Sequence, residues 1–344
     1  MSRNLLLARL RFWGYTFCTG SFCCTIPAKE NPMYTFIINP ASRSGLGGQV
    51  WSRLEPVLKD NHIPYRAWQT GYQRHATRLA RELTADGKEH TIIVLGGDGT
   101  VNEVVDGIRD LDRVILGYIP VGSGNDFARS LGIPKDPKAA LGLVLSPPGY
   151  APMNAGQIAY SDHAGRTRTK RFAVSAGLGF DAAICHQAVI SRLKPVLNRL
   201  HLGKLTYALI ALDRLRLLRR ATCTVTLDGG ETLTFPDVLF AAAMNHPFEG
   251  GGFMFCPAAD PCDGRLDLIA VSGVSRLRAL LLLPLALKGA HTRAKGITIR
   301  TFERAVITSD TALPVHTDGE PVFLQRRMEI SLAPGRLRVI APGS

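Results

Sequence analysis

The chain has 344 residues, enough for two domains with hydrophobic cores, and its 46% apolar residues, 34 glycines and 21 prolines suit a loop-rich α/β enzyme. Its 41 basic and 28 acidic residues give a net charge of +13, which indicates a partner of negative charge: a nucleotide, a nucleic acid or an anionic membrane. Nucleic acid is disfavoured, because aromatic residues make up only 7% of the chain and are not interleaved with the basic ones.

Seven cysteines without a CxxC pair indicate neither a disulfide framework nor a zinc site, so we expect a cytoplasmic protein. Residues 1–32 differ from the rest of the chain, and Arg9 and Arg11 interrupt any signal-peptide core. We expect this extension to be a disordered tail or a mis-called start. The longest apolar run elsewhere, residues 279–287, spans nine residues with Pro284 inside it, too short to cross a bilayer.

Four segments in the first half of the chain are predicted as strands, and each is followed by a polar or glycine-rich loop. The strands fall at residues 34–38, 65–68, 91–95 and 114–119. Helical patterns follow at about residues 49–59, around 76–83 and at 101–108. Strands that alternate with helices in this way predict a parallel, doubly wound sheet.

The loops that follow these strands predict a binding crevice, since ligands of such sheets lie outside the carboxyl ends of the strands. Those ends carry residues 39–45, Thr70, residues 96–102 and residues 122–126. A glycine loop before a helix can cradle phosphate with its backbone N–H groups. Asp98 in that loop would repel a phosphate unless a divalent cation lies between them. An NAD(P) oxidoreductase is disfavoured, because the first loop, NPASRSG, lacks the dinucleotide fingerprint.

After about residue 150, short β-rich segments separated by turns predict a mainly antiparallel β-sandwich domain. We therefore expect an α/β domain at residues 33–152, joined by a C-terminal segment of about 310–344, and a β-rich domain at 153–309. Within the latter, a helical insert at 188–220 has eight basic residues against Asp213: Arg192, Lys194, Arg199, Lys204, Arg214, Arg216, Arg219 and Arg220. Residues 276–304 hold seven Lys or Arg against Glu303 alone. Both segments indicate contact with an anionic membrane surface, with a solvated basic face as the alternative.

Five motifs in this order resemble the diacylglycerol kinase catalytic family, most closely its soluble bacterial lipid kinases. They are GGDGTVNE (96–103), PVGSGNDFAR (120–129), NHPFEGGG (245–252), DPCDGRLDL (260–268) and HTDGE (316–320). The resemblance covers roughly residues 33–340 and implies a nucleotide cleft between the two domains, with residues 153–309 as the lipid-substrate domain. It implies transfer of the γ-phosphoryl group of ATP, with Mg²⁺, to a lipid hydroxyl, most simply diacylglycerol to give phosphatidic acid. Asp126 favours a glycerolipid over a sphingoid base, because some relatives carry another residue after the Asn.

The same resemblance implies the site residues. Those lining the ATP cleft are Asn39, Pro40, Ala41, Ser42, Thr70, Gly96, Gly97, Asp98, Gly99, Thr100, Val101, Asn102, Ser123, Asn125 and Asp126. Asp98 would hold a Mg²⁺ that bridges ATP oxygens, and Asp260, Asp263 and the carbonyl of Arg265 an accessory Mg²⁺; a solvated Asp-rich turn is the alternative for the latter.

Asp318 is expected to act as general base with Glu320 supporting it, because an alcohol needs a carboxylate at hydrogen-bond distance as its proton is lost. For DGE alone, a hairpin turn is the alternative. Relatives usually have Gly-His-Ala after the second strand, whereas here Arg74 precedes His75, which leaves the backbone shape of that loop open.

Two other functions stay open. An NAD kinase shares the GGDGT loop and the two-domain plan, although GSGNDFA and HTDGE fit the lipid kinases better. A non-catalytic nucleotide- or lipid-binding regulator would be expected to lose Asp98, Asp318 or Glu320, and all three are present. We expect a cytoplasmic protein that associates peripherally with an anionic membrane. The acceptor lipid and the choice between monomer and homodimer are left open.

Overall fold

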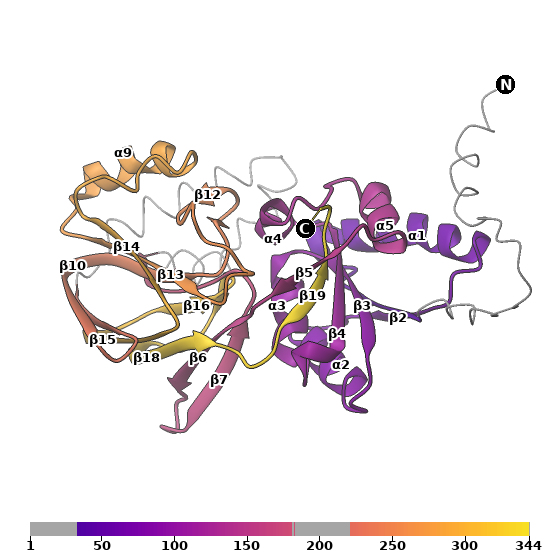
Figure 1. The fold of residues 1–344 in the computed structure, drawn as a ribbon, viewed down its shortest axis with the longest axis horizontal. Coiled ribbons are helices and arrows are strands. Elements are labelled where there is room, and N and C mark those ends of the chain that lie inside the picture. The colour runs from indigo at the N-terminus through magenta and orange to yellow at the C-terminus, as the bar shows by residue number, and fades with distance from the viewer. Residues whose placement is uncertain (1–32, 181, 183–220, 344) are drawn as a thin grey trace, which may run out of the picture. The chain divides into compact units, whose positions relative to one another are not determined.

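The first sheet combines the four predicted strands with two later segments of the chain (Figure 1). Within the residues that the computed structural model describes (33–180, 182 and 221–343), it has six strands in the order β2-β1-β3-β4-β19-β5. Their bounds are β1 (Tyr34–Ile38), β2 (Tyr65–Gln69), β3 (His90–Gly96), β4 (Val114–Pro120), β5 (Tyr150–Met153) and β19 (Leu337–Ile340). The first four pair in parallel, β19 is parallel to β4, and β5 runs antiparallel to β19 at the edge. The predicted parallel sheet is confirmed.

Helices cover both faces of this sheet, so it is doubly wound as predicted. They are α1 (Ser42–Asp60), α2 (His75–Leu83), α3 (Asp98–Gly107), α4 (Asp126–Ser130) and α5 (Pro137–Leu145), with a 3₁₀ turn η1 (Leu111–Arg113). One core contains residues of α1 and α5, and the other contains residues of α2, α3 and α4. The central strands β1, β3 and β4 read as nearly continuous apolar runs because both of their faces are buried, whereas β2 at the edge of the sheet is mostly exposed.

Helix α1 begins seven residues before the predicted start at Gln49. Arg43, Ser44 and Gly45 have left-handed backbone angles (φ 48°, 57° and 93°), so the regular helix is separated from Ser42 by a kink. The apolar period used for the prediction first becomes visible beyond this kink, where Val50, Trp51 and Leu54 enter the core.

The second domain is mainly antiparallel, as expected. Within the described ranges its large sheet has eleven strands, in the path β17-β16-β8-β10-β9-β15-β18-β6-β7 with β13 and β14 branching from β10. The bounds are β6 (Gly156–Ser161), β7 (Thr167–Phe172), β8 (Ser175–Gly179), β9 (Ala221–Leu227), β10 (Glu231–Met244), β13 (Leu266–Ser272), β14 (Ile297–Phe302), β15 (Arg304–Leu313), β16 (Val315–Thr317), β17 (Glu320–Pro321) and β18 (Gln325–Leu332). A hairpin of β11 (Phe248–Glu249) and β12 (Phe253–Met254) and the helix α9 (Arg276–Ala286) complete it.

Alternation of apolar and polar residues explains these strands. In β9, the buried residues are Ala221, Cys223, Val225 and Leu227, which lie in a hydrophobic core of the second domain. The threonines between them are more exposed. Such a period of two is typical of a sheet with one face in a core. The predicted basic insert 188–220 and the extension 1–32 lie outside the described residues.

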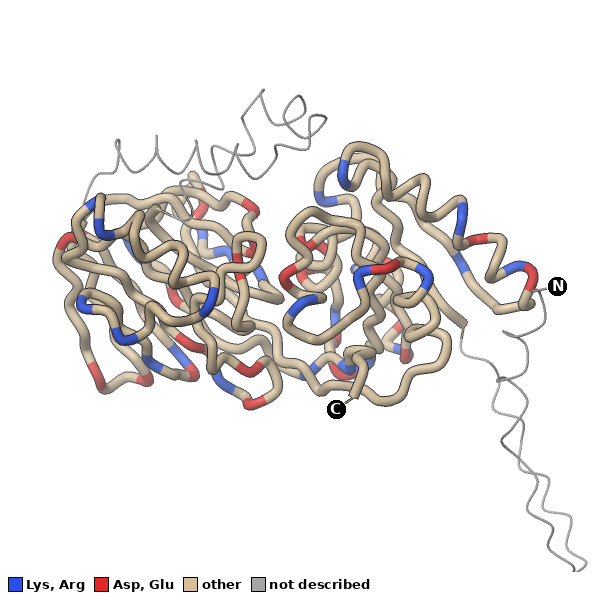
Figure 2. Tube along the Cα trace, turned by 90° about the horizontal axis from the view of Figure 1, so that it is seen from above, with Lys and Arg blue, Asp and Glu red and all other residues tan. Residues whose placement is uncertain are grey.

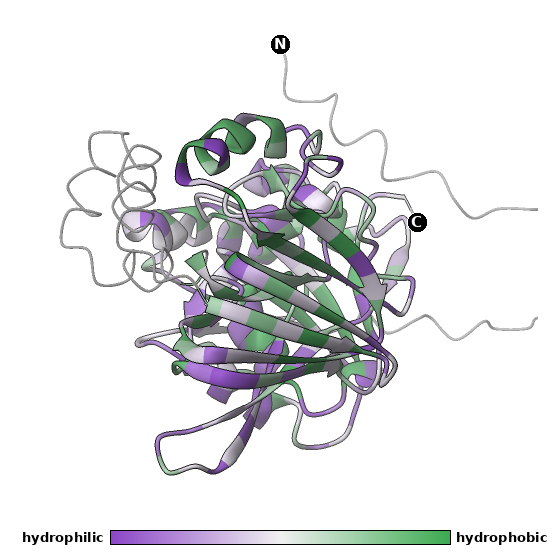
Figure 3. Cartoon of the chain, turned by 90° about the vertical axis from the view of Figure 1, so that its left-hand side faces the viewer, coloured by the Kyte–Doolittle hydropathy of each residue, from purple (hydrophilic) through white to green (hydrophobic). Residues whose placement is uncertain are grey.

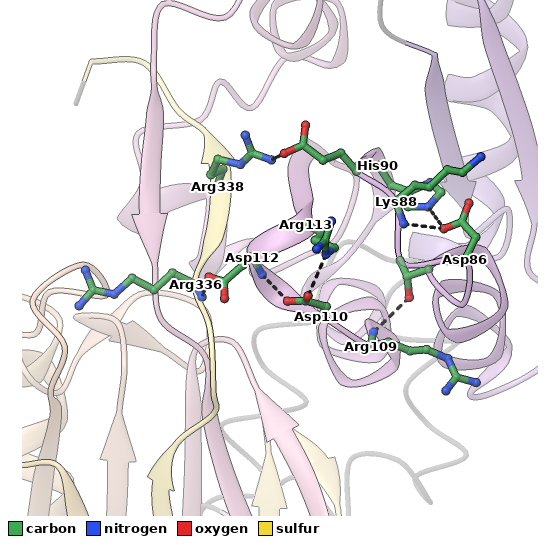
Figure 4. Close-up of polar contacts among 11 residues, drawn as sticks. Asp86, Lys88, His90, Arg109, Asp110, Asp112, Arg113, Arg336 and Arg338 are labelled. Carbon is green, nitrogen blue, oxygen red and sulfur yellow. Dashed lines mark hydrogen bonds and ion pairs between the residues drawn. The ribbon is translucent and has the colours of Figure 1, made fainter.

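The last strand returns the chain to the first domain. Of the C-terminal segment 310–344 that we expected to join that domain, β19 lies in the first sheet, whereas β16, β17 and β18 belong to the second. Leu337 and Val339 of β19 are fully buried there. At the entry to β19, the Arg336 N–H donates to Asp112 at 2.8 Å and the Arg338 guanidinium lies 2.9 Å from the Glu89 carboxylate (Figure 4).

Candidate active site

The two glycine loops that follow β3 and β4 lie directly against each other. A side chain at Gly97 would place its Cβ 3.2 Å from the Cα of Gly122, so both positions need glycine for this approach. The backbone N–H of Val121 donates to the carbonyl of Gly96 at 2.7 Å. Asn125, in a left-handed conformation (φ 52°), donates from its amide to the carbonyl of Gly122 at 3.0 Å. The predicted residues of GGDGTVNE and PVGSGNDFAR are thereby brought together.

The loop after β1 joins them from the other side. The amide of Asn39 donates to the Thr100 hydroxyl at 3.0 Å, and its oxygen accepts the N–H of Ala41 at 3.1 Å. The N–H of Thr70 donates to the carbonyl of Ile38 at 2.8 Å, which places the end of β2 beside this loop. Ser123 is exposed in its loop. Three loops thus line one end of the sheet with amides and hydroxyls, groups that suit phosphate oxygens.

Asp98 is the first residue of α3 and caps a neighbouring helix. Its carboxylate accepts the N–H groups of Asp126 and Phe127 at 3.1 and 3.3 Å, at the start of α4. Burial, together with the nearby charge of Asp126, raises the pKa of Asp98 to about 6. Two carboxylates that are buried side by side repel each other, and a bound cation would offset this repulsion.

Asp126 connects this cleft to the NHPFEGGG motif. Its carboxylate pairs with Arg129 and accepts the N–H of Gly251 at 2.6 Å, and burial raises its pKa. The Arg129 guanidinium in turn lies 5.5 Å from the ring centre of Phe248. Gly250, Gly251 and Gly252 have φ of 67°, 86° and 115°, a backbone conformation that favours glycine in this motif.

The carboxylate of Asp318 accepts four hydrogen bonds. It accepts the backbone N–H groups of Ala173, Val174 and Ser175 at 2.7, 2.8 and 2.8 Å, and the amide of Asn102 at 2.7 Å. These four donors match the number of lone-pair sites on a carboxylate. Burial raises the pKa of Asp318 in spite of these bonds. In this structure the residue expected as general base therefore links α3 of the first domain to β7 and β8 of the second.

Glu320 has different surroundings, because one of its oxygens faces the phosphate loop. Its Oε2 accepts the amide of Gln73 at 3.2 Å, and its Oε1 would lie 3.2 Å from a Cβ at Gly99. Lys170 of β7 is only 7% exposed near these groups. Burial lowers the pKa of Lys170, an effect that the charges of Asp106, Glu320 and Asp318 oppose. Sequence reasoning missed Gln73 and Lys170, since neither lies in a recognisable motif.

A buried histidine sets the shape of the HTDGE turn, and it was also missed. His316 is fully buried, its Nδ1 accepts the Gly319 N–H at 3.1 Å, and its Nε2 lies 3.2 Å from Glu249 Oε1. Because Nδ1 accepts, the proton of the neutral ring is assigned to Nε2, which donates to Glu249. This pair ties the turn to the NHPFEGGG segment. The histidine stands in the quoted motif, but nothing in the sequence identified Glu249 as its partner.

The loop after β2 keeps the backbone shape that a glycine would adopt. Arg74 has φ 65°, and the N–H groups of Arg74 and Ala76 donate to the Glu103 carboxylate at 2.9 and 3.2 Å. Glu103 of the GGDGTVNE motif thus caps the start of α2. The Arg74 side chain is exposed at this end of the sheet.

The acidic turn of the DPCDGRLDL motif lies at the surface. Asp260 accepts the N–H of Cys262 at 2.9 Å, and Asp263 accepts the N–H of Arg265 at 2.8 Å, each through its Oδ1. In the described part of the chain, no group of three His, Cys, Asp or Glu side chains is arranged to hold a metal ion. The second oxygens of the two carboxylates and the Arg265 carbonyl are nevertheless ligands of the type that Mg²⁺ selects.

Comparison with known proteins agrees with this geometry. Residues 33–148 match the diacylglycerol kinase catalytic domain, and residues 174–341 match the YegS C-terminal NAD kinase beta sandwich-like domain. The chain is 31% identical over 312 residues to a diacylglycerol kinase of Mycobacterium tuberculosis (strain CDC 1551 / Oshkosh), covering 90% of this chain and 94% of that protein. It is 32% identical over 267 residues to a diacylglycerol kinase of Bacillus subtilis (strain 168), covering 73% and 80%.

A solved structure of a diacylglycerol kinase from Bacillus anthracis str. Sterne has the same fold, with a TM-score of 0.65 and 21% identity over 92% of this chain and 98% of that chain. The chain belongs to the diacylglycerol kinase family, whose members named here are kinases of lipids.

Proposed function

We propose that this protein is an ATP- and Mg²⁺-dependent lipid kinase that phosphorylates the hydroxyl of diacylglycerol to give phosphatidic acid. The observation that carries the proposal is the position of Glu320, whose Oε1 faces Gly99 of the phosphate loop. Phosphoryl transfer requires an attacking hydroxyl, a group that accepts its proton, and phosphate-binding amides within a few ångströms of each other.

The nucleotide would lie across the carboxyl ends of β1, β3 and β4. The N–H groups at residues 96–102 and the start of α3 suit its phosphates, and Asn39, Thr70 and Ser123 suit its polar edges. Mg²⁺ would supply positive charge between Asp98 and the phosphate oxygens. The raised pKa of Asp98 supports this part of the proposal, because a buried carboxylate gains most from a nearby cation.

We assign the proton acceptor to Glu320 and a positioning role to Asp318. As the acceptor oxygen forms its bond to the γ-phosphorus, the bond to ADP breaks and the hydroxyl proton passes to the Glu320 carboxylate. Asp318 accepts one hydrogen bond from Asn102 of the first domain and three from the backbone at residues 173–175 of the second, and His316 holds the turn that carries both Asp318 and Glu320. Lys170 would offset the negative charge that gathers around Glu320.

The remaining expectations belong to the same proposal. Residues 33–152 would bind the nucleotide and residues 153–309 the lipid. An accessory Mg²⁺ at Asp260, Asp263 and the Arg265 carbonyl would stiffen the second domain. Since diacylglycerol resides in membranes, the enzyme would associate with the membrane surface from the cytoplasm. We propose that this association is peripheral. No helix in the described ranges is long and apolar enough to cross a bilayer.

The test is transfer of labelled γ-phosphate from ATP to a bacterial lipid extract, followed by identification of the labelled product. Wild-type protein should label phosphatidic acid, and Glu320→Gln and Asp98→Asn should lose most of this activity. Asp60→Asn serves as a matched control, because Asp60 is exposed at the end of α1. Absence of any labelled lipid, or equal labelling by Glu320→Gln, would show that the proposal is wrong.

A further inference from the structure

Helix α9 carries leucines on the side that faces away from the protein. Leu277, Leu281 and Leu285, spaced four residues apart, are 70%, 66% and 44% exposed, and Leu287 after the helix is 51% exposed. These are four of the eleven large apolar side chains exposed within the described residues. Figure 3 shows α9 at the top of the view as a largely green helix. Exposed apolar side chains gathered on one short element mark a contact surface.

The opposite side of α9 packs against a hydrophobic core of its own domain. Ala279, Leu280 and Leu282 pack against the core formed by β10, β13 and the segment around Cys256. A helix that is apolar on all sides normally lies wholly inside a core. Because α9 has a core on one side only, its outer leucines can be buried only by a second apolar environment outside this core.

The charge around α9 indicates what that environment is. Residues 268–302 contain no Asp or Glu, and Arg276, Arg278 and Lys288 are exposed beside the leucines. Two arginines in the first turn of a helix lie at the wrong end of the helix dipole, so they do not serve the stability of α9. Figure 2 shows the Lys and Arg positions of this domain in blue. Leucines flanked by basic residues complement an anionic membrane surface.

The packing after α9 connects the helix to the candidate active site. A Cβ at Gly289 would lie 2.9 Å from the sulfur of Met254, so the turn after α9 packs against the hairpin of β11 and β12, which begins within the NHPFEGGG motif. In that hairpin, the ring of Phe253 stacks on Phe255 at 5.8 Å, and the N–H of Gly251 binds Asp126. Helix α9 thus contacts the hairpin of β11 and β12, and this hairpin contacts Asp126 beside the phosphate-binding loops. A membrane bound to α9 would therefore be linked to these loops through one short segment of the chain.

We infer that α9 is a membrane-docking helix, with Leu277, Leu281, Leu285 and Leu287 entering the boundary between headgroups and acyl chains. Arg276, Arg278 and Lys288 contact anionic headgroups around them. This inference rests on the proposed function, because docking would give the enzyme access to a lipid acceptor. Docking itself is measured without catalysis.

The experiment measures co-sedimentation of the full chain, without ATP, with vesicles of phosphatidylcholine alone or with phosphatidylglycerol added. Leu277→Ser combined with Leu281→Ser should lower the partition coefficient at least about tenfold, since each leucine loses much of its apolar transfer free energy. Arg278→Ser combined with Lys288→Ser should lower binding to the anionic vesicles by roughly tenfold and leave binding to the neutral vesicles unchanged.

Two control variants match these changes elsewhere on the surface. Met33→Ser with Val57→Ser removes two exposed apolar residues, and Arg53→Ser with Arg326→Ser removes two exposed basic ones. Both controls should bind like wild type, and thermal unfolding should be unchanged in all four variants. The inference is overturned if the α9 variants bind vesicles like wild type, or if the controls weaken binding equally. It is also overturned if the leucine changes act only by dissociating a dimer in light scattering.

Kinase assays on detergent-dispersed diacylglycerol separate this inference from the proposed function. The α9 variants should retain activity on dispersed lipid and lose it on vesicles. If wild type phosphorylates no lipid in either form while α9-dependent binding is seen, the proposed function fails and the docking inference stands.

Discussion

The side-chain amide of Asn102 donates to the carboxylate of Asp318 at 2.7 Å, and this bond joins the first domain to the second. Asn102 lies on α3, directly after the phosphate loop, while Asp318 lies in the turn between β16 and β17. The same carboxylate accepts the three consecutive N–H groups of Ala173, Val174 and Ser175, which run from the end of β7 into the start of β8. The distance between the phosphate loop and Glu320 therefore depends on Asp318, even if Asp318 never touches the substrate.

Loss of the Asp318 carboxylate should destabilise the fold, whereas loss of the Glu320 charge should not. Asp318→Ala leaves several buried donors without an acceptor, and each costs about 1–3 kcal/mol, so we expect the free energy of unfolding to fall by about 3 kcal/mol or more. Glu320→Gln should change it by less than about 1 kcal/mol, because an amide can replace a half-buried carboxylate. Denaturant unfolding measures both, with Asp60→Ala as the surface control. If Asp318→Ala is as stable as the control, the anchoring role is wrong.

The pH dependence of stability should carry the signature of Asp98. Its pKa is raised to about 6 in the folded protein, above the ordinary aspartate value of 3.8, so the folded state binds this proton more tightly than the unfolded state. The stabilisation is fully present below pH 3.8 and is lost as pH rises through about 6. Without divalent cations, the melting temperature should therefore fall as the pH rises from about 4 to about 6.

Kinase activity should change in the opposite direction, because Asp98 must be ionised to hold Mg²⁺. Activity is expected to rise between pH 5 and 7, and added Mg²⁺ should raise the melting temperature more at pH 7.5 than at pH 5. Asp98→Asn should lose the part of the melting profile that depends on this carboxylate. An identical profile for the variant would assign the dependence to other groups, such as Asp126 or Asp318, whose pKa values are also raised by burial.

Arg74 offers a separate test of backbone strain and of side-chain charge. A left-handed conformation costs a non-glycine residue roughly 1 kcal/mol, so Arg74→Gly should be as stable as wild type or slightly more so. Arg74→Ala keeps the strained backbone and should gain no stability. If the exposed guanidinium contacts phosphate, both variants should raise the KM for ATP by a similar factor with little change in kcat. A KM that rises in only one variant would indicate a backbone effect instead.

The acidic turn predicts a cation-dependent gain in stability that does not involve the active site. If Asp260 and Asp263 hold Mg²⁺, millimolar Mg²⁺ should raise the melting temperature by mass action, and Asp260→Asn with Asp263→Asn should remove that part of the rise. The measurement is thermal unfolding of the Asp98→Asn background with and without the two turn substitutions, which removes the contribution of Asp98. Equal Mg²⁺ shifts in both proteins would show that the turn is a solvated loop.

Local patterns were sufficient for the strands and loops of the first domain. The predicted strands match β1 to β4 within a residue or two at each end. For β1, β3 and β4 the reason is that strands buried on both faces leave a nearly uninterrupted apolar signal. The start of α1 was less visible, since left-handed residues precede its regular part. The domain assignment of residues 310–332 was not visible either, because the sequence of a strand carries no sign of the sheet it will join.

The sequence by itself determined that Gly97, Asp98 and Asn125 stand at strand ends, where backbone amides and carboxylates converge. Local chemistry suffices there, since glycine spacing and apolar periodicity are properties of a few neighbouring residues. Only the tertiary structure decided the different surroundings of Asp318 and Glu320. Two carboxylates two residues apart look equivalent along the chain, but one receives four donors from distant segments and the other faces the phosphate loop. Hydrogen-bond partners more than a hundred residues away leave no mark on the local pattern.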